Sequence, residues 1–254
     1  MSTPADHEAA ARIAAEAGEL LVETRANLFR LGADMWTVRD TGDQRAHDFI
    51  MEKLRAEFPN DGILSEEGVD DLERLEKERV WIVDPLDGTR EFSEPGRSDW
   101  AVHVALCENG IPTAGSVALP AIGVTLNADP APVLPPRADG PPRMVVSRSR
   151  ATAATAIVGQ AIGAEMLALG SAGAKAMAVV MGHADIYAHS GGQYEWDNCA
   201  PAIVAMAAGC HASRCDGSEM TFNHADPWLP DFVICRPEFA DEVMAALDEA
   251  IRRS

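Results

Sequence analysis

Hydrophobic residues recur at helical spacing in two stretches near the start of the chain, residues 7–29 and residues 43–58. Apolar positions separated by three and four residues place their side chains on one face of a helix, so both stretches are predicted to be amphipathic helices. Residues 36–42, which lie between them, are predicted to form a loop or a short strand. This prediction puts Asp43 at the start of the second helix.

Short apolar runs follow the second predicted helix, and they indicate β-strands. They occupy residues 62–64, 81–83, 100–106, 115–119 and 124–126. Together, the last three suggest an antiparallel sheet.

The pattern changes after residues 129–143, which contain six prolines and almost no apolar periodicity. We expect this segment to be a loop at a boundary between subdomains. Strands at 144–147, 166–169, 184–188 and 232–235 then alternate with helices at 152–162, 172–181, 197–208 and 237–253. Because such alternation favours an α/β layer, the pattern predicts an α+β half over residues 1–142 and an α/β half over residues 143–254.

The composition limits the classes of function that the chain can have. Its 254 residues, 47% of them hydrophobic, are enough for a full core in one large or two modest domains. A net charge of -19 argues against a nucleic-acid duplex or an anionic membrane as a partner. The sequence shows no signal-peptide pattern and no apolar run of roughly 20 residues, so a cytoplasmic location is expected. The oligomeric state is left open between a monomer and a homodimer.

The most informative segment is Trp81 to Thr89, where an apolar run leads into two aspartates, Asp84 and Asp87. Proline after the first aspartate and glycine after the second favour a turn in which both carboxylates and the Leu86 carbonyl face one point. A hard divalent cation prefers such a set of oxygen ligands. The alternative is an ordinary turn with two solvated aspartates.

Two further acidic residues make the metal site the better interpretation. Glu66 follows the apolar run at 62–64, and Asp197 precedes the helical segment at 200–208. Taken alone, Glu66 would be a solvated surface residue and Asp197 a helix N-cap. Gathering these two and the aspartates of the turn around one cavity would be strongly repulsive unless cations neutralised the charge.

The motifs Ser-Glu-Glu at 65–67, Asp-Pro-Leu-Asp-Gly-Thr at 84–89 and Trp-Asp at 196–197 occur in this order. In these three motifs and in their order, the chain resembles the lithium-sensitive, magnesium-dependent phosphatases that include inositol monophosphatases and fructose bisphosphatases. It is most similar to bacterial 3'(2'),5'-bisphosphate nucleotidases of sulfur assimilation, because Arg90-Glu91-Phe92 stands where inositol phosphatases usually have Thr-Asn-Phe. The resemblance implies a layered α/β/α/β/α sandwich, an α+β fold with the metal site between its halves.

The resemblance also implies a magnesium site of two or three ions. Glu66, Asp84 and the Leu86 carbonyl would hold the ion that activates water. Asp84, Asp87 and Asp197 would hold a second ion near the leaving oxygen.

Residues around the turn have catalytic roles in this interpretation. The Thr89 hydroxyl would orient the attacking water and would itself be held by Asp43. Backbone N–H groups of Gly88 and Thr89 would bind the phosphate, as at a helix N-terminus. The alternative for Asp43 is a helix N-cap.

The substrate is predicted to be 3'-phosphoadenosine 5'-phosphate, which would lose its 3'-phosphate to give AMP. Ser171, Lys175 and Arg148 are the groups available to bind the phosphate that is not cleaved. His189 stands where many nucleotidases have an arginine, and it could donate a hydrogen bond although it is only partly charged at neutral pH. Inositol and sugar phosphates therefore remain as alternatives.

Two other classes of protein fit the sequence less well. A glycosidase needs two carboxylates and usually an aromatic sugar platform, whereas this chain has a larger acidic set and only 6% aromatic residues. A non-catalytic metal- or metabolite-binding protein would lack one functional group of the set. Thr89 and Asp43 are both present, which favours an enzyme.

Overall fold

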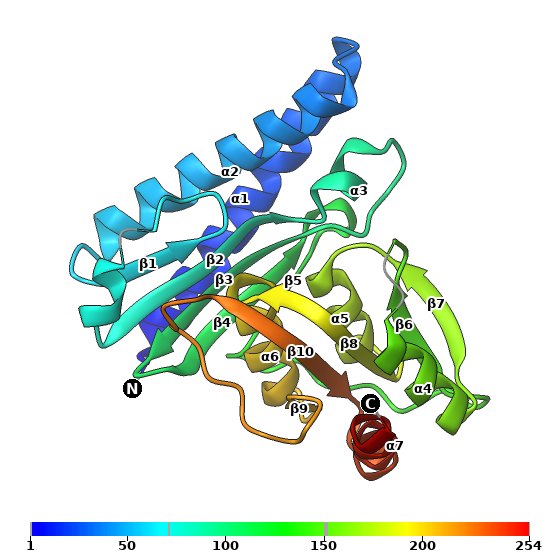
Figure 1. The fold of residues 1–254 in the computed structure, drawn as a ribbon. Helices are drawn as coiled ribbons and strands as arrows, with labels where there is room; N and C mark the ends of the chain where they lie inside the picture. The colour runs from blue at the N-terminus through cyan, green and yellow to red at the C-terminus, as the bar shows by residue number, and fades with distance from the viewer. Residues whose placement is uncertain (1, 71, 150–151, 254) are drawn as a thin grey trace.

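The computed structural model of the chain describes residues 2–70, 72–149 and 152–253. These residues contain two five-stranded sheets with helices on both sides of each (Figure 1). No helix among them is both long and apolar enough to cross a bilayer.

The first sheet has the strand order β1-β2-β3-β4-β5. Its strands are β1 (Gly62–Ser65), β2 (Arg79–Asp87), β3 (Ala101–Glu108), β4 (Ile111–Leu119) and β5 (Val124–Asn127). β1 pairs with β2 in parallel, and the remaining pairs are antiparallel, as predicted for the last three strands.

Strand β2 is buried on both of its faces, which explains its continuous apolar run. Trp81 and Val83 pack toward the helices on the outer face, whereas Val80 and Ile82 pack into the core between the sheets. This alternation follows from the twofold period of a strand.

Helices α1 (Pro4–Arg30) and α2 (Met35–Glu57) cover the outer face of the first sheet (Figure 1). The prediction of a loop or strand at 36–42 was wrong, because α2 begins at Met35. Asp34 caps it by accepting hydrogen bonds from the backbone N–H groups of Trp36 and Thr37.

Gly42 looks like a turn residue in the sequence, but it provides close packing inside α2. A Cβ atom there would lie 2.6 Å from the Phe92 ring and 2.9 Å from the Leu86 side chain. Asp43 is consequently in the middle of a helix, and the alternative that it is an N-cap was wrong.

The second sheet has the order β7-β6-β8-β10-β9. Its strands are β6 (Arg143–Ser147), β7 (Glu165–Leu169), β8 (Ile186–Tyr194), β9 (His211–Ser213) and β10 (Trp228–Cys235). β6 is parallel to β7 and β8, but the β8–β10 and β10–β9 pairs are antiparallel. Strand β8 extends well beyond the predicted end at residue 188, and β9 had no counterpart among the predicted strands.

Four helices complete the layers (Figure 1). α5 (Ala172–Val180) and α6 (Glu195–Ala207) pack between the two sheets, and α4 (Ala153–Ile162) and α7 (Ala240–Arg253) lie beyond the second sheet. The predicted layered α/β/α/β/α sandwich is therefore confirmed. A short helix, α3 (Thr89–Ser93), follows β2, and 3-10 turns occur at Glu73–Glu76, Pro120–Ile122 and Pro237–Phe239.

The proline-rich segment joins the two sheets without forming a helix or strand over residues 129–142. Arg137 anchors it, with Nε 3.7 Å from the buried Asp185 carboxylate and its guanidinium 5.1 Å from the Phe239 ring centroid. The predicted loop is thus held against the second sheet.

Candidate active site

Asp84 and Asp87 belong to strand β2, which does not end before them, and a β-bulge between them directs their side chains toward the site. Asp84 pairs with His103 of β3, but Asp87 pairs with Ala101, so three steps along β2 match two steps along β3. Such a bulge bends the strand and changes the direction of its side chains. One carboxylate oxygen each from Asp84, Asp87 and Asp197 consequently lie within 4.8 Å of one another.

Asp197 reaches this cluster from the first turn of α6. Its Oδ2 accepts a hydrogen bond of 2.7 Å from the Tyr194 backbone N–H, so it also stabilises the start of the helix. The neighbouring Trp196 carbonyl accepts a 2.9 Å hydrogen bond from His103 Nδ1. Strand β3 and helix α6 are therefore fixed to each other beside the carboxylates.

Asp87 connects the first sheet to the N-terminus of α5. Its Oδ1 accepts a hydrogen bond from Ala172 N at 3.0 Å, and its Oδ2 accepts bonds from Gly173 N at 2.6 Å and Ser171 Oγ at 2.5 Å. His103 Nε2 lies 3.2 Å from the same oxygen. Although burial alone would raise it, these neighbours hold the pKa of Asp87 well below its usual range.

The pKa values of the other carboxylates of the site shift in the opposite direction. Burial and the charges of Glu66, Asp87 and Asp197 raise the pKa of Asp84 well above its usual value. Burial and the charge of Asp87 raise the pKa of Asp197 to about 6. Glu66 keeps an exposed side chain, yet desolvation of its carboxylate and the charge of Asp197 raise its pKa to about 8.

This donor set fits a divalent cation. Among the described residues, neither an arginine nor a lysine forms an ion pair with the buried Asp84, and the three clustered ligand atoms of Asp84, Asp87 and Asp197 are all carboxylate oxygens. Hard divalent cations prefer such ligands, and their charge would remove the repulsion that raises these pKa values. The acidic cluster can therefore hold metal.

Thr89 and Asp43 meet at the edge of the cluster, although they come from different elements. Thr89 Oγ1 lies 3.2 Å from Asp43 Oδ1 and 3.1 Å from the Leu86 carbonyl oxygen. Burial and the charge of Glu67 raise the pKa of Asp43 to about 7. The hydroxyl is thus held between a carboxyl group that can change its protonation state near neutral pH and the carbonyl of the turn.

Gly88 forms the sharp turn between β2 and α3. Its φ of +88° lies in the left-handed region that favours glycine. A Cβ atom at this position would lie 3.1 Å from the Ser171 side chain, so the two halves of the fold approach closely here. The backbone N–H groups that follow Gly88 begin the short helix α3.

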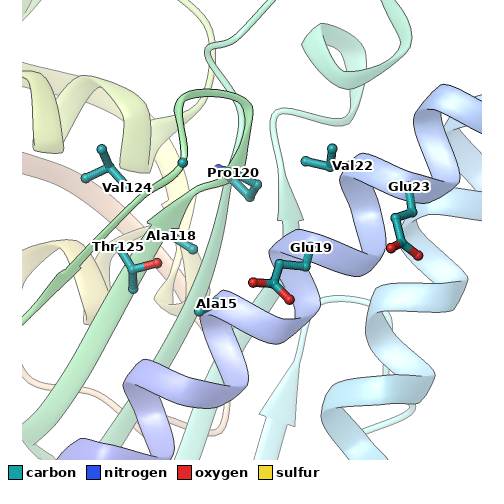
Figure 2. A pocket seen from close by; sticks show the side chains of 9 residues that line it. Ala15, Glu19, Val22, Glu23, Ala118, Pro120, Val124 and Thr125 are labelled. Atoms are coloured by element: carbon teal, nitrogen blue, oxygen red, sulfur yellow. The ribbon is translucent and has the colours of Figure 1, made fainter.

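A cavity of about 420 Å³ opens beside the cluster. Glu66, Asp87 and Asp197 line it, and Ser171, Lys175 and His189, three of the predicted substrate-binding residues, line it as well. A second cavity of about 450 Å³ lies between α1 and the β4–β5 turn, where Glu19 and Glu23 face Pro120 and Thr125 (Figure 2). It contains none of the predicted site residues.

Lys175 is only 4% exposed and is held inside the protein. Its Nζ donates hydrogen bonds to the carbonyl oxygens of Gly170, at 3.2 Å, and Ser171, and it lies 5.3 Å from the Tyr187 ring centroid. Burial lowers its pKa. Two of its three N–H donors are thus used to stabilise the turn before α5.

Arg148, a predicted substrate-binding residue, does not line the cavity, whereas Arg90 does. Arg148 forms ion pairs with Glu91 at 2.6 Å and Glu94 at 2.9 Å, and it is not among the described residues that line the cavity. Arg90 does line the cavity, and sequence reasoning missed it in this role. Its position directly after the Asp-Gly-Thr turn was the available signal.

Comparison with known proteins gives the family. A sequence profile described as the inositol monophosphatase family matches residues 5–130 and 141–252. The chain belongs to the inositol monophosphatase family. The two matched segments leave out most of the proline-rich loop.

Mycobacterial relatives match nearly the whole chain, and a more distant relative matches about three quarters of it. The 3'-phosphoadenosine 5'-phosphate phosphatase of Mycobacterium tuberculosis is 49% identical over 251 residues, which are 93% of this chain and 91% of that protein. The protein of the same name from Mycobacterium leprae is 46% identical over 96% of this chain and 94% of its own length. The 3'(2'),5'-bisphosphate nucleotidase CysQ of Escherichia coli is 32% identical over 74% of this chain and 80% of its own.

Solved structures agree with the fold. CysQ from Bacteroides thetaiotaomicron, a bacterial member of the family, superposes with a TM-score of 0.76 at 25% identity, covering 91% of this chain and 97% of its own. Inositol monophosphatase II from Staphylococcus aureus gives a TM-score of 0.77 at 20% identity, with 95% of both chains covered, and supports the fold alone. The predicted family and its predicted likeness to bisphosphate nucleotidases are confirmed.

The raised pKa values predict how metal and pH affect stability. Asp197, Asp43 and Glu66 have folded-state pKa values of about 6, 7 and 8, above those of unfolded carboxylates. Each group makes its full contribution to the free energy of unfolding at a pH below its pKa in the unfolded chain. This contribution is lost as the pH rises through its pKa in the folded protein. The melting temperature of the metal-free protein should therefore fall between pH 6 and pH 8, by roughly 2–4 °C for each kcal/mol lost.

Circular dichroism melts in EDTA and in saturating Mg²⁺ test this prediction. Mg²⁺ should raise the melting temperature most at the alkaline end, because a ligand that binds only the folded state stabilises it. Asp84→Asn, which removes one charge from the cluster, should flatten the metal-free profile and weaken the response to Mg²⁺. A metal-free melting temperature that rises from pH 6 to pH 8 would contradict the electrostatic account.

The close contact between α5 and β3 predicts that a larger side chain at Gly173 destabilises the protein. A Cβ atom at Gly173 would lie 2.0 Å from the buried His103 Nε2, so Gly173→Ala should destabilise the protein by about 1–3 kcal/mol, as overpacking does. Gly159→Ala in α4 is the matched control, because its close contact would be with the flexible end of Met166 and its next neighbour is the Met144 sulfur at 3.7 Å. Urea unfolding should show a loss for the first variant and none for the second; equal losses would mean that His103 does not constrain α5.

Proposed function

We propose that the protein is a Mg²⁺-dependent phosphomonoesterase that converts 3'-phosphoadenosine 5'-phosphate to AMP and phosphate. The observation that carries this proposal is the cluster of Asp84, Asp87 and Asp197, of which Asp87 and Asp197 line a cavity. The mycobacterial relatives, 46–49% identical over at least 93% of the chain, support the substrate, because they are named for it.

The proposed metal ligands fall into two groups, for two or three ions. Glu66, Asp84 and the Leu86 carbonyl would form one group, and Asp84, Asp87 and Asp197 the other. Asp87 Oδ1 accepts a single hydrogen bond from α5, and a carboxylate oxygen has room for a second partner. When bound, the cations would acidify a nucleophilic water and offset the charge of the phosphoryl and leaving oxygens.

Thr89 and Asp43 would position the nucleophile. The Thr89 hydroxyl lies between Asp43 and the Leu86 carbonyl, so it can accept a proton from a water beside it while it donates to either neighbour. Asp43, whose pKa is about 7, can take up that proton near neutral pH. The first N–H groups after Gly88 would hold the phosphate that is cleaved.

The second phosphate of the substrate would bind to the hydrogen-bonding and cationic groups that line the cavity. Lys175 keeps a third N–H donor, and Ser171 and His189 line the same space. We add Arg90 to this group. Arg148 is retained only as the residue that holds Glu91 through an ion pair.

Inositol monophosphate and fructose 1,6-bisphosphate are the alternative substrates, since the family includes enzymes named for inositol phosphates. A non-catalytic metal-binding protein is the alternative of another class. The contact between Thr89 and Asp43 favours an enzyme, because a protein that only binds metal has no use for a hydroxyl held in this way.

The role of Thr89 can be tested by changing its hydroxyl. Thr89→Ala should lower kcat about 100-fold or more, the usual scale of proton-transfer assistance, with little change in KM or in the Mg²⁺ concentration needed. Thr89→Ser retains the hydroxyl and should keep most of the activity. If the alanine variant mainly shifts the Mg²⁺ titration, Thr89 acts on the metal site and not on the water.

The substrate is tested by phosphate release from 3'-phosphoadenosine 5'-phosphate, inositol monophosphate and fructose 1,6-bisphosphate. The nucleotide should have the largest kcat/KM, because its second phosphate binds away from the reacting centre and orients it. Lys175→Met should lower kcat/KM for the nucleotide about tenfold and leave inositol monophosphate nearly unchanged. An equal loss on all three substrates would make Lys175 a structural residue, and a preference for inositol or fructose phosphates would refute the proposed substrate.

A further inference from the structure

Two aromatic rings are stacked at the wall of the cavity. The ring centroids of Tyr194 and Trp196 lie 4.8 Å apart, and the planes differ by only 7°. Both residues line the cavity that contains Asp197. Trp196 is partly buried against the core between the sheets, whereas Tyr194 is 44% exposed. Since Trp196 covers one face of the tyrosine ring, the exposed surface includes the other face.

The backbone fixes this pair relative to the carboxylates. The Tyr194 N–H donates to Asp197 Oδ2, and the Trp196 carbonyl accepts from His103 Nδ1. Before the pair, Gly191 and Gly192 have φ values of +109° and +90°, which let the end of β8 turn toward the site. The ring of Tyr194 is thus attached to the same helical turn that supplies a proposed metal ligand.

The rest of the described lining offers little comparable surface. Arg90, Glu91, Ser147 and Ser149 are polar. Tyr187 and His189 also carry rings, but they are only 1% and 7% exposed, far less than Tyr194. An ester whose phosphate lies at the carboxylates has its organic part beside Tyr194 or beside these polar groups. A flat apolar group would be bound better by the exposed ring.

We propose that Tyr194, supported by Trp196, is the surface on which the nucleobase of the substrate stacks. This inference rests on the proposed function, because it needs a nucleotide substrate, and it assigns the recognition of the base to a residue outside the catalytic motifs. Inositol and fructose phosphates have no planar ring system to stack. Base stacking on an aromatic side chain tolerates any base, so the site would select nucleotides as a class and adenine only weakly.

Kinetics with a pair of substrates test the proposal. The pair is 3'-phosphoadenosine 5'-phosphate and 1-deoxyribose 3,5-bisphosphate, which has both phosphates but no base. Tyr194→Leu should raise KM for the nucleotide at least fivefold, the factor that corresponds to about 1 kcal/mol of base stacking. It should leave KM for the base-free substrate and both kcat values within about twofold, and Tyr194→Phe should restore the nucleotide KM.

A control variant and a second measurement make the result specific. Trp228→Leu replaces an aromatic residue that is 49% exposed and pairs with Tyr194 across the β8–β10 ladder but does not line the cavity. It should leave the ratio of the two KM values unchanged. Calorimetric titration with AMP and with ribose 5-phosphate gives a reading without turnover, and Tyr194→Leu should weaken only the binding of AMP.

The failures of the two proposals can be told apart. If the wild type turns over the nucleotide but Tyr194→Leu affects both substrates equally, the stacking role is wrong and the proposed function stands. If the wild type does not prefer the nucleotide over inositol monophosphate, and AMP binds no more tightly than ribose 5-phosphate, both proposals are overturned.

Discussion

The carboxylate of Asp87 is the interaction on which the active-site architecture depends. It is a residue of the first sheet that accepts hydrogen bonds from the N-terminus of α5, a helix packed between the two sheets. A negative charge at a helix N-terminus is favourable. His103 Nε2 lies beside the same carboxylate, and although burial alone would lower it, Asp87 raises the pKa of this histidine. The same contact that holds the halves together therefore keeps one member of the acidic cluster ionised.

The ionised forms of the other carboxylates of the site are stabilised far less than that of Asp87. Asp84, Asp197 and Glu66 have raised pKa values because they are desolvated next to like charges, and the fold does not give Asp84 a cationic partner among the described residues. Ionising these carboxylates without a bound cation is therefore unfavourable. Active sites commonly have this property, because the charges that bind metal are placed where a fold optimised for stability alone would not put them.

Much of the site could be predicted from the sequence because its motifs are short and local. Asp84, Leu86, Asp87 and Thr89 lie within six consecutive residues, so the spacing alone indicates that they lie close together. Long-range features could not be read in this way. Gly42 resembles a turn residue but serves helix packing against Phe92, and Arg148 looked free until the fold placed Glu91 and Glu94 beside it.

The net negative charge of the whole protein couples the binding of an anionic substrate to the binding of cations. With a net charge of -19, the protein repels a phosphate ester at long range, and the cationic groups inside the cavity are few and partly engaged. Burial also lowers the pKa of Lys175, which reduces its hold on the proton just where an anion must bind. An anionic substrate and divalent cations should therefore bind cooperatively, since each neutralises the charge that opposes the other. The aromatic pair at Tyr194 and Trp196 fits this scheme, because stacking contributes affinity that does not depend on charge.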